Sequence, residues 1–491
     1  MTHSLCRRPK IKTSAKDKPK ECRSEHAAAG LDAPRWNPAI ADDGRVKYRS
    51  LVDSIRSAIL SGDLVDDERL PTQRVLAARL GINVATVTKA IAEAGRLGLV
   101  VTRVGGGTHV VATRKAPSVA VANNAGIIDL SINIPPMALV RPLLDDVLVT
   151  LARRRRGGDM FDYALLGGSE RDRNAGVSWV ATRGLQAVVG QLLVTQGAHE
   201  GLFAALSAAA KPGDVVLCED LNYTGIRRLS QLCQINLVGV TTDGAGMQPK
   251  ALAEALVKHS PAVIVCTPVT LNPTTASQDI DVRRAIIGLA KKHAVTVIED
   301  DIYGYLAGDG TPPLAALWPE GVIYVCGLSK SVAPGLRLGY LLAPERFINR
   351  IGDALGLLSW TAPSLHAAVA TELINSGIAE ACARLHHDEA RKRMDLAYGI
   401  LGDALVVGPS ATYHGWLQLP PAWRDHDAAA VLRQEGILVS PAKHFLVGDM
   451  DPPSAVRISL GAAPDIGLLE GALWRITEVL ERQPTTIESI V

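Results

Sequence analysis

One lysine has neighbours that suit covalent chemistry. Lys330 ends the string GLSK (residues 327–330), which follows an apolar run, and the string PGLRLG (residues 334–339) comes just behind it. A lysine amine can form a Schiff base with an aldehyde, and an arginine with a hydroxyl can bind a phosphate. A lone Ser-Lys pair carries almost no information. This combination predicts Lys330 as the nucleophile, with Ser329 and Arg337 as phosphate ligands.

Two polar side chains upstream could hold a nitrogen heterocycle. Asp300 ends another apolar run, and Tyr303 follows three residues later. A carboxylate can keep a pyridine nitrogen protonated, and a phenol can face a ring hydroxyl. Asp301 is the rival for the nitrogen, but the three-residue step to Tyr303 favours Asp300. Acidic residues after a strand are usually helix caps, yet the position 30 residues before Lys330 favours a functional interpretation.

Further candidates come earlier in the chain. Asn272, in an Asn-Pro-Thr string, could be a second partner of the ring hydroxyl, or it could simply form a turn. Gly197, Ala198 and His199 open an apolar helix, whose N-terminal amides can bind a phosphate. His199 could equally be a solvent-facing residue of the first turn. Tyr223 is placed to stack on the ring, although a lone loop tyrosine more often just packs.

Together these groups form the set that pyridoxal 5′-phosphate (PLP) chemistry needs. Their order resembles that of fold type I aminotransferases, from residue 128 to the C-terminus. The resemblance implies an aldimine between PLP and Lys330 and adds two residues. Arg457 corresponds to the arginine that pairs with a substrate α-carboxylate, unless it is a surface charge at a strand edge. Tyr163 corresponds to a tyrosine that reaches the partner's phosphate across a homodimer.

The chain departs from this family at two positions. Thr275 stands where the family commonly has glycine after Asn-Pro-Thr, which can shift the loop near the ring hydroxyl. Gly327 stands where the family commonly has serine or threonine three residues before the lysine. The second change removes one phosphate hydroxyl. Neither forbids the covalent bond, but both favour relaxed catalysis with retained cofactor sensing.

The elements that must position these groups alternate along the chain. Apolar runs of strand length at 215–217, 262–266, 295–298 and 322–325 are separated by amphipathic helical segments. This alternation predicts an α/β fold with a largely parallel sheet. The resemblance implies a fold type I transferase domain over residues 128–491, with a mixed, mostly parallel sheet, helices on both faces and a small C-terminal α/β domain.

The sequence pattern of residues 45–113 predicts a separate module of three helices and a hairpin. Thr72 is a candidate N-cap for the second helix, in which Val75, Leu76 and Leu80 are expected to point inward. Asn83 can cap the third helix, and two short strands around a Gly-Gly-Gly turn form a wing. Residues 1–44 are interpreted as a disordered basic arm and 114–127 as a linker.

The module's sequence resembles the winged helix of GntR-type transcription regulators, including its Leu-Pro-x-x-Arg opening and its Arg-x-Gly-x-Gly-Thr wing. A three-helix unit that touches no nucleic acid is the alternative from periodicity alone. By the match, the DNA contacts are Arg74, Thr86, Thr88, Lys89, Gly105 and Gly107. The family often has Ser-Arg at the start of the recognition helix, where this chain has Asn83-Val84. That arginine contact is therefore missing, so the operator sequence cannot be inferred.

Composition agrees with a DNA-binding module on an acidic body. The net charge is only +2, but residues 1–113 are net basic and the remainder is net acidic. No apolar stretch approaches the length of a membrane span, and no signal peptide is evident. The seven cysteines are scattered without metal-ligand spacing, so we expect no metal site and a cytoplasmic protein with reduced thiols.

A GntR winged helix before an aminotransferase-like body is the arrangement of the MocR regulators. The resemblance implies a homodimeric transcription regulator that binds operator DNA and senses PLP, or an amino compound that reacts with it. The first alternative is a working transaminase with a DNA-binding appendage, which retained Lys330, Asp300, Tyr303 and Arg457 would allow. The second is a dimer on DNA that binds no PLP.

Overall fold

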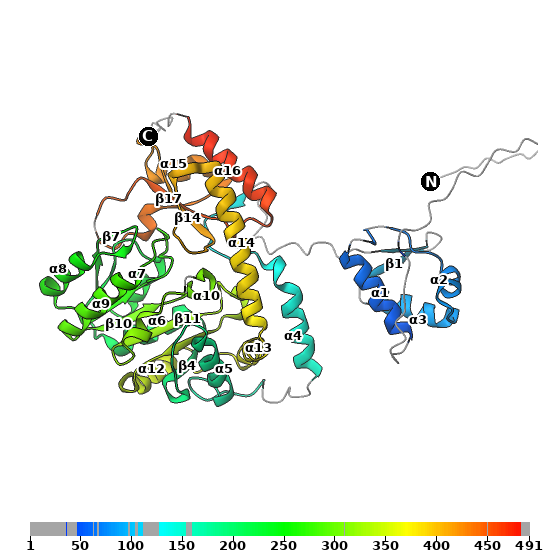
Figure 1. Ribbon diagram of the computed structural model, residues 1–491, viewed down its shortest axis with the longest axis horizontal. Helices are drawn as coiled ribbons and strands as arrows, with labels where there is room; N and C mark the ends of the chain where they lie inside the picture. The colour runs from blue at the N-terminus through cyan, green and yellow to red at the C-terminus, as the bar shows by residue number, and fades with distance from the viewer. Residues whose placement is uncertain are drawn as a thin grey trace, which may run out of the picture. The chain divides into compact units, whose positions relative to one another are not determined.

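The computed structural model describes residues 36, 47–61, 63–65, 68–96, 99–103, 107–110, 127–153, 160–308, 310–448 and 450–482. The chain divides into two compact units, residues 1–117 and 118–491 (Figure 1). Each unit has its own buried apolar core.

The first unit contains three helices and a two-stranded antiparallel hairpin. These are α1 (Lys47–Ser61), α2 (Gln73–Leu80), α3 (Val84–Arg96), β1 (Val100–Arg103) and β2 (Gly107–Val110). Thr72 caps α2 by accepting a hydrogen bond from the Val75 amide at 3.4 Å, and Gly81 ends that helix with φ +61°. Leu76 is buried, but Val75 is 42 % exposed, so its predicted inward position was wrong. Asn83 accepts from the Ala85 amide at 2.9 Å and so caps α3.

The second unit is built on a seven-stranded sheet. In spatial order its strands are β4 (Leu192–Thr195), β12 (Gly339–Leu342), β11 (Val322–Gly327), β10 (Thr296–Asp300), β9 (Val263–Cys266), β5 (Val215–Glu219) and β6 (Asn236–Val240). Only β12 runs antiparallel to its neighbours in this sheet. The predicted runs therefore form β5, β9, β10 and β11 of a mostly parallel sheet.

Both faces of the sheet are buried under helices, as the continuous apolar strands require. Along β11, Ile323 and Val325 face one core while Val322 and Tyr324 face the other. The face with Ile323 is covered by α6 (Ala198–Ala209), α7 (Thr224–Leu232) and α12 (Glu345–Leu358). The opposite face is covered by α4 (Arg141–Arg153), α5 (Glu170–Ala181), α8 (Pro249–His259), α9 (Ile280–His293), α11 (Leu314–Leu317) and α13 (Ser364–Asn375).

A smaller antiparallel sheet with its own core completes the second unit (Figure 1). Its strands are β13 (Leu405–Val406), β14 (His414–Gln418), β17 (Ala455–Ser459) and β16 (Ser440–Pro441). The helices packed around this core are α14 (Ile378–Leu401), α15 (Asp425–Gln434) and α16 (Ile466–Leu480). Further elements of the second unit are the short helix α10 (Gly304–Ala307) and two strand pairs, β3 (Ile128–Asp129) with β15 (Ile437–Leu438) and β7 (Thr242–Asp243) with β8 (Gly246–Met247).

No single helix in the described parts of the chain is long and apolar enough to cross a membrane. Helices α2 and α3 pass that test only as a pair bent by 118°, and Leu76, Val87 and Ile91 on these helices are buried in the core of the first unit.

Candidate functional site

A cavity of about 450 Å³ opens where the parallel strands of the large sheet end. Asp300 is the last residue of β10, and Ser329 and Lys330 follow the end of β11. Ligands of open α/β sheets bind at this carboxyl edge. The cavity gathers most of the predicted site residues: Ala198, His199, Tyr223, Asn272, Asp300, Tyr303, Ser329, Lys330, Arg337 and Arg457. Gly197 is the N-cap of α6, directly before Ala198.

Lys330 reaches the cavity with a weakly basic amine. Its Nζ donates a hydrogen bond to the Asn133 carbonyl. Burial lowers the pKa of Lys330 to about 8, helped by the charges of Arg457 and Arg337 and opposed by Asp300. A lysine with this pKa has a substantial neutral fraction at physiological pH, and only the neutral amine is nucleophilic.

We expect the attachment rate of an added aromatic aldehyde at Lys330 to follow this pKa. The rate should rise almost tenfold from pH 6 to pH 7 and level off above about pH 8, because the neutral fraction saturates there. Stopped-flow absorbance of the imine, with borohydride trapping to locate it, measures this. Exposed lysines, whose ordinary pKa is about 10.4, provide the control. A rate that still rises tenfold between pH 9 and pH 10 would contradict the lowered pKa.

Asp300 faces the cavity, whereas Asp301 faces away from it. Asp300 accepts a hydrogen bond from the Ile302 amide at 3.3 Å, and its pKa is raised to about 7, mainly by burial. Asp301 accepts from Arg183 Nε at 3.0 Å and from Tyr324 Oη at 2.7 Å on the other side of the strand end. Burial disfavours the ionised form of this carboxylate, so a cationic partner such as a pyridinium would stabilise it.

Two residues that the sequence did not suggest orient Tyr303. Asn133 Nδ2 donates to Tyr303 Oη at 2.9 Å and to His414 Nδ1 at 3.0 Å. Thr412 Oγ1 lies 2.8 Å from the same His414 nitrogen, and burial lowers the pKa of His414 to about 3, so its ring is neutral. Because Tyr303 Oη already accepts from Asn133, its own proton is available to an acceptor in the cavity. No motif marks Asn133 or His414, since the fold alone brings them to Tyr303.

The N-terminus of α6 and Arg337 form a cradle for a phosphate. Gly197 has φ +86°, and a Cβ there would lie 3.2 Å from Arg337 Nη2, so glycine allows close approach. The first amides of α6 are free to bind an anion. A Cβ at Gly327 would lie 2.9 Å from Ile302 Cδ1 and 3.3 Å from the Ala198 amide nitrogen. The space that the hydroxyl of a serine or threonine would occupy at position 327 is therefore partly filled.

Two aromatic rings form one wall of the cavity. His199 and Tyr223 meet edge to face, with ring centroids 6.0 Å apart. Burial lowers the pKa of His199 and raises that of Tyr223, so both rings are neutral at pH 7. Neutral aromatic rings of this kind can pack against a flat heterocycle.

Arg457 brings a buried positive charge to the cavity. Its Nη1 donates to Asn272 Oδ1 at 3.0 Å, and its Nη2 donates to the Ser131 carbonyl. The guanidinium lies 5.0 Å from the centroid of the Phe445 ring. Burial lowers its pKa to about 10, and its buried Nε has no hydrogen-bond partner among the residues that the structure describes. An unpaired donor on a buried cation is what an incoming carboxylate would satisfy.

Tyr163 does not lie in this cavity. Its side chain is 90 % exposed and lines a separate hollow of about 440 Å³ together with Arg171 and Ser364.

The backbone of Thr275 is left-handed, with φ +64°. Glycine, which the family commonly has at this position, adopts this conformation without strain. A β-branched residue in this region is strained by about 1–2 kcal/mol, while glycine loses about 0.5–1 kcal/mol through the unfolded chain. We therefore expect Thr275→Gly to raise the free energy of unfolding by up to about 1 kcal/mol in urea titrations. Thr150→Gly in α4 is the control and should lower it by about 0.3 kcal/mol. Because the Thr275 side chain is buried, a loss of stability in Thr275→Gly would mean that the burial lost exceeds the strain relieved.

The predicted DNA contacts that the structure describes lie on α2, α3 and β2 of the first unit. Arg74, Thr88 and Lys89 are exposed and Thr86 is half-buried. Thr88 Oγ1 donates to Gln73 Oε1 at 2.7 Å, and Lys89 Nζ lies 4.4 Å from the centroid of the Tyr48 ring.

In the wing, Gly107 has φ +92°, while Gly105 lies outside the described residues. A Cβ at Gly107 would lie 2.7 Å from Arg69 Nε, so glycine at this position leaves room for the Arg69 side chain. Arg69, which the sequence did not single out, forms a β-bridge with His109 of β2.

Comparison with known proteins identifies both units. Residues 125–476 match the family model "Aminotransferase class I and II", and residues 47–110 match "Bacterial regulatory proteins, gntR family". The chain therefore belongs to the aminotransferase class I and II family and carries a gntR-family helix-turn-helix unit in front. This is the organisation of a MocR-type transcription regulator, and the cofactor of its larger unit is PLP.

Two relatives align over almost their whole length. The HTH-type transcriptional regulator YdeF of Bacillus subtilis is 29 % identical over 91 % of this chain and 97 % of its own. TauR of Rhodobacter capsulatus, also an HTH-type transcriptional regulator, is 26 % identical over 89 % of this chain and 97 % of its own. These relatives do not favour a transaminase as the function of the whole chain.

Solved structures share the fold of the second unit. An archaeal alanine:glyoxylate aminotransferase superposes with a TM-score of 0.68 at 20 % identity, covering 81 % of this chain and 95 % of its own. LysN, the α-aminoadipate aminotransferase of Thermus thermophilus, gives 0.67 at 21 % identity, covering 73 % and 92 %.

Proposed function

We propose that this regulator holds PLP through Lys330 and responds to an amino compound that reaches the same cavity. The observation that carries the proposal is the convergence of Lys330, Asp300, Tyr303 and Arg457 on one cavity of about 450 Å³. When bound, PLP supplies an aldehyde that exchanges between the protein's amine and that of a small molecule.

Each side chain then has a separate role. Asp300 binds the pyridine nitrogen, and Tyr303 donates to the ring oxygen, oriented by Asn133. Asn272 adds a second partner for that oxygen through its amide nitrogen, because its Oδ1 is held by Arg457. The phosphate is held by Ser329, Arg337 and the α6 terminus, whose first residues are Ala198 and His199 after Gly197.

The orphaned donor on Arg457 supports a carboxylate on the amino compound. When the amine of Lys330 loses or regains its positive charge, the net charge inside the cavity changes. Such a change can shift the population of closed and open states of the large unit and so regulate DNA binding.

We further propose that the regulator acts as a homodimer on operator DNA in the cytoplasm. Phe161, Tyr163 and Leu165 are 80 %, 90 % and 73 % exposed on one segment. That segment lies against α13, since Ser364 Oγ donates to the Asp162 carbonyl at 2.7 Å. Exposed apolar side chains in one place favour a protein interface, and a partner cavity is the natural recipient of Tyr163. Two winged helices would then bind two half-sites through Arg74, Thr86, Thr88, Lys89, Gly105 and Gly107.

The test combines chemical trapping with DNA binding. Borohydride treatment of the PLP-loaded protein should leave the label on Lys330 alone, as peptide mass spectrometry would show. Lys330→Ala should lose the absorbance near 400 nm and the PLP dependence of operator affinity. Unchanged operator affinity with and without PLP in both proteins would refute the sensing role. Steady turnover of an amino acid with a 2-oxo acid would support the transaminase alternative.

A further inference from the structure

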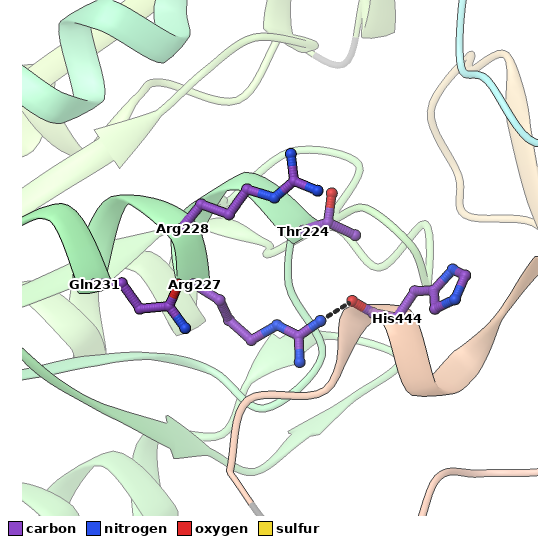
Figure 2. Close-up of a pocket in the computed structure, with 5 residues that line it drawn as sticks. All are labelled: Thr224, Arg227, Arg228, Gln231 and His444. Carbon is purple, nitrogen blue, oxygen red and sulfur yellow. Dashed lines mark hydrogen bonds between the residues drawn. The ribbon is translucent and has the colours of Figure 1, made fainter.

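A second cavity, of about 540 Å³, lies at the start of α7 beside the cofactor cavity. Thr224, Arg227, Arg228, Gln231 and His444 line it, as Figure 2 shows. Thr224 and His444 also line the cofactor cavity. The two cavities are therefore adjacent, with shared walls at the first turn of α7 and in the segment that carries His444.

The lining of this second cavity is basic. Arg227 and Arg228 extend from the same helix, and Arg227 Nη2 donates to the His444 carbonyl at 2.7 Å (Figure 2). Neither arginine forms an ion pair with a carboxylate in the parts of the chain that the structure describes. The remaining side chains, from Thr224, Gln231 and His444, can all donate hydrogen bonds. Arginines free of acidic partners, surrounded by donors, suit an anion such as a carboxylate, sulfonate or phosphonate.

Two observations connect this charge to the cofactor cavity. The positive charge of Arg228 contributes to lowering the pKa of His199 and opposes the rise in that of Tyr223, so its field reaches the aromatic wall. The residue after His444 is Phe445, whose ring packs under the Arg457 guanidinium. One short segment, Ala442–Phe445, thus contacts Arg457 through Phe445 and Arg227 through the His444 carbonyl.

We propose that this second cavity binds a distal anionic group of the effector, so that the effector is an amino acid with a second acidic group. The inference rests on the proposed function, in which the amine reaches the cofactor and one carboxylate binds Arg457. Arg228 then supplies the free cation for the second acid, while Arg227 holds the segment at His444 in place.

The first experiment uses matched amino acids that differ by one charge. The PLP-loaded full-length protein is titrated with L-glutamate and L-glutamine, and with L-aspartate and L-asparagine, following the absorbance near 400 nm. For at least one pair, we expect half-saturation by the acid at a concentration at least tenfold lower than by its amide. Arg228→Gln should reduce this ratio below about threefold at equal cofactor loading. The control is Arg433→Gln, an exposed arginine of α15 outside both cavities, which should keep the wild-type ratio.

The second experiment does not depend on reaction with the cofactor. Glutarate has two carboxylates and no amine, and its effect on the melting temperature of the cofactor-free protein is measured at constant ionic strength. Glutarate should stabilise the wild type and the Arg433→Gln control by about 2 °C more than Arg228→Gln. Equal stabilisation of all three proteins, or equal acid preference in wild type and Arg228→Gln, would overturn the proposal. If glutarate stabilises the wild type more than Arg228→Gln but no amino acid changes the spectrum, the anion site stands and the proposed sensing role fails.

Discussion

Asp300→Asn should make the cofactor-free protein more stable and its cofactor binding weaker. Burial raises the pKa of Asp300 to about 7, from an ordinary value near 4. The ionised carboxylate therefore costs the folded state up to about 4 kcal/mol above pH 7. The amide avoids this cost and can still accept from the Ile302 amide. We expect a gain of about 2–4 kcal/mol at pH 8 in urea unfolding followed by tryptophan fluorescence.

The gain should depend on pH in a defined direction. A carboxyl group with a raised folded-state pKa loses stability as pH rises from its unfolded value toward its folded value. The difference between Asp300→Asn and wild type should therefore grow from pH 5 to about pH 7 and then level off. Asp388→Asn, at an exposed position of α14, should show no such growth. A difference that stays constant or shrinks with rising pH would contradict the raised pKa of Asp300.

The same substitution should weaken PLP binding. A charge-assisted hydrogen bond to the pyridine nitrogen contributes about 1.5–3 kcal/mol, so affinity should fall about 10- to 100-fold. Equilibrium titration at 400 nm measures this fall. Stability gained with function lost is the pattern expected of a residue retained for its chemistry.

Arg457→Lys should leave the cofactor bound but reduce the response to carboxylate-bearing amines by about 100-fold. Arg457 is held over Phe445, and its buried Nε has no hydrogen-bond partner among the described residues, so a carboxylate could accept from it. Lysine keeps the charge but loses the planar guanidinium and the contact with Asn272. Spectral titration with an α-amino acid and with the corresponding simple amine separates the two effects.

The simple amine is the control for this prediction, because it lacks the carboxylate that Arg457 would bind. Its half-saturation should change less than threefold between wild type and Arg457→Lys. An equal loss for both ligands would mean that Arg457 shapes the cavity and does not recognise the carboxylate. An unchanged response to the amino acid would remove Arg457 from the site.

The sequence predicted the large sheet because its strands are buried on both faces and read as apolar runs. It also favoured Asp300 over Asp301, and the structure directs successive side chains at the end of β10 to opposite sides, as the period of a strand requires. The two-residue strands β13 and β16 carry no comparable pattern, since they contain too few residues to show alternation.

The residues missed in the site share a physical reason. Asn133 and His414 are 281 positions apart in the chain and meet only because β14 and the segment after β3 lie beside Tyr303. A hydrogen bond between such distant residues leaves no local signal. Val75 was misjudged for the opposite reason. It has the spacing of a buried residue, but α2 has only eight residues, of which Leu76 and Ala77 are buried.

A side chain at position 327 would meet two neighbours that differ in how easily they can move. A new Cβ would lie 2.9 Å from Ile302 Cδ1, which is the end of a flexible side chain and can turn aside at little cost. It would also lie 3.3 Å from the amide nitrogen of Ala198, which is backbone at the start of α6. The cost of a serine or threonine there would therefore fall on the helix terminus and not on the apolar core.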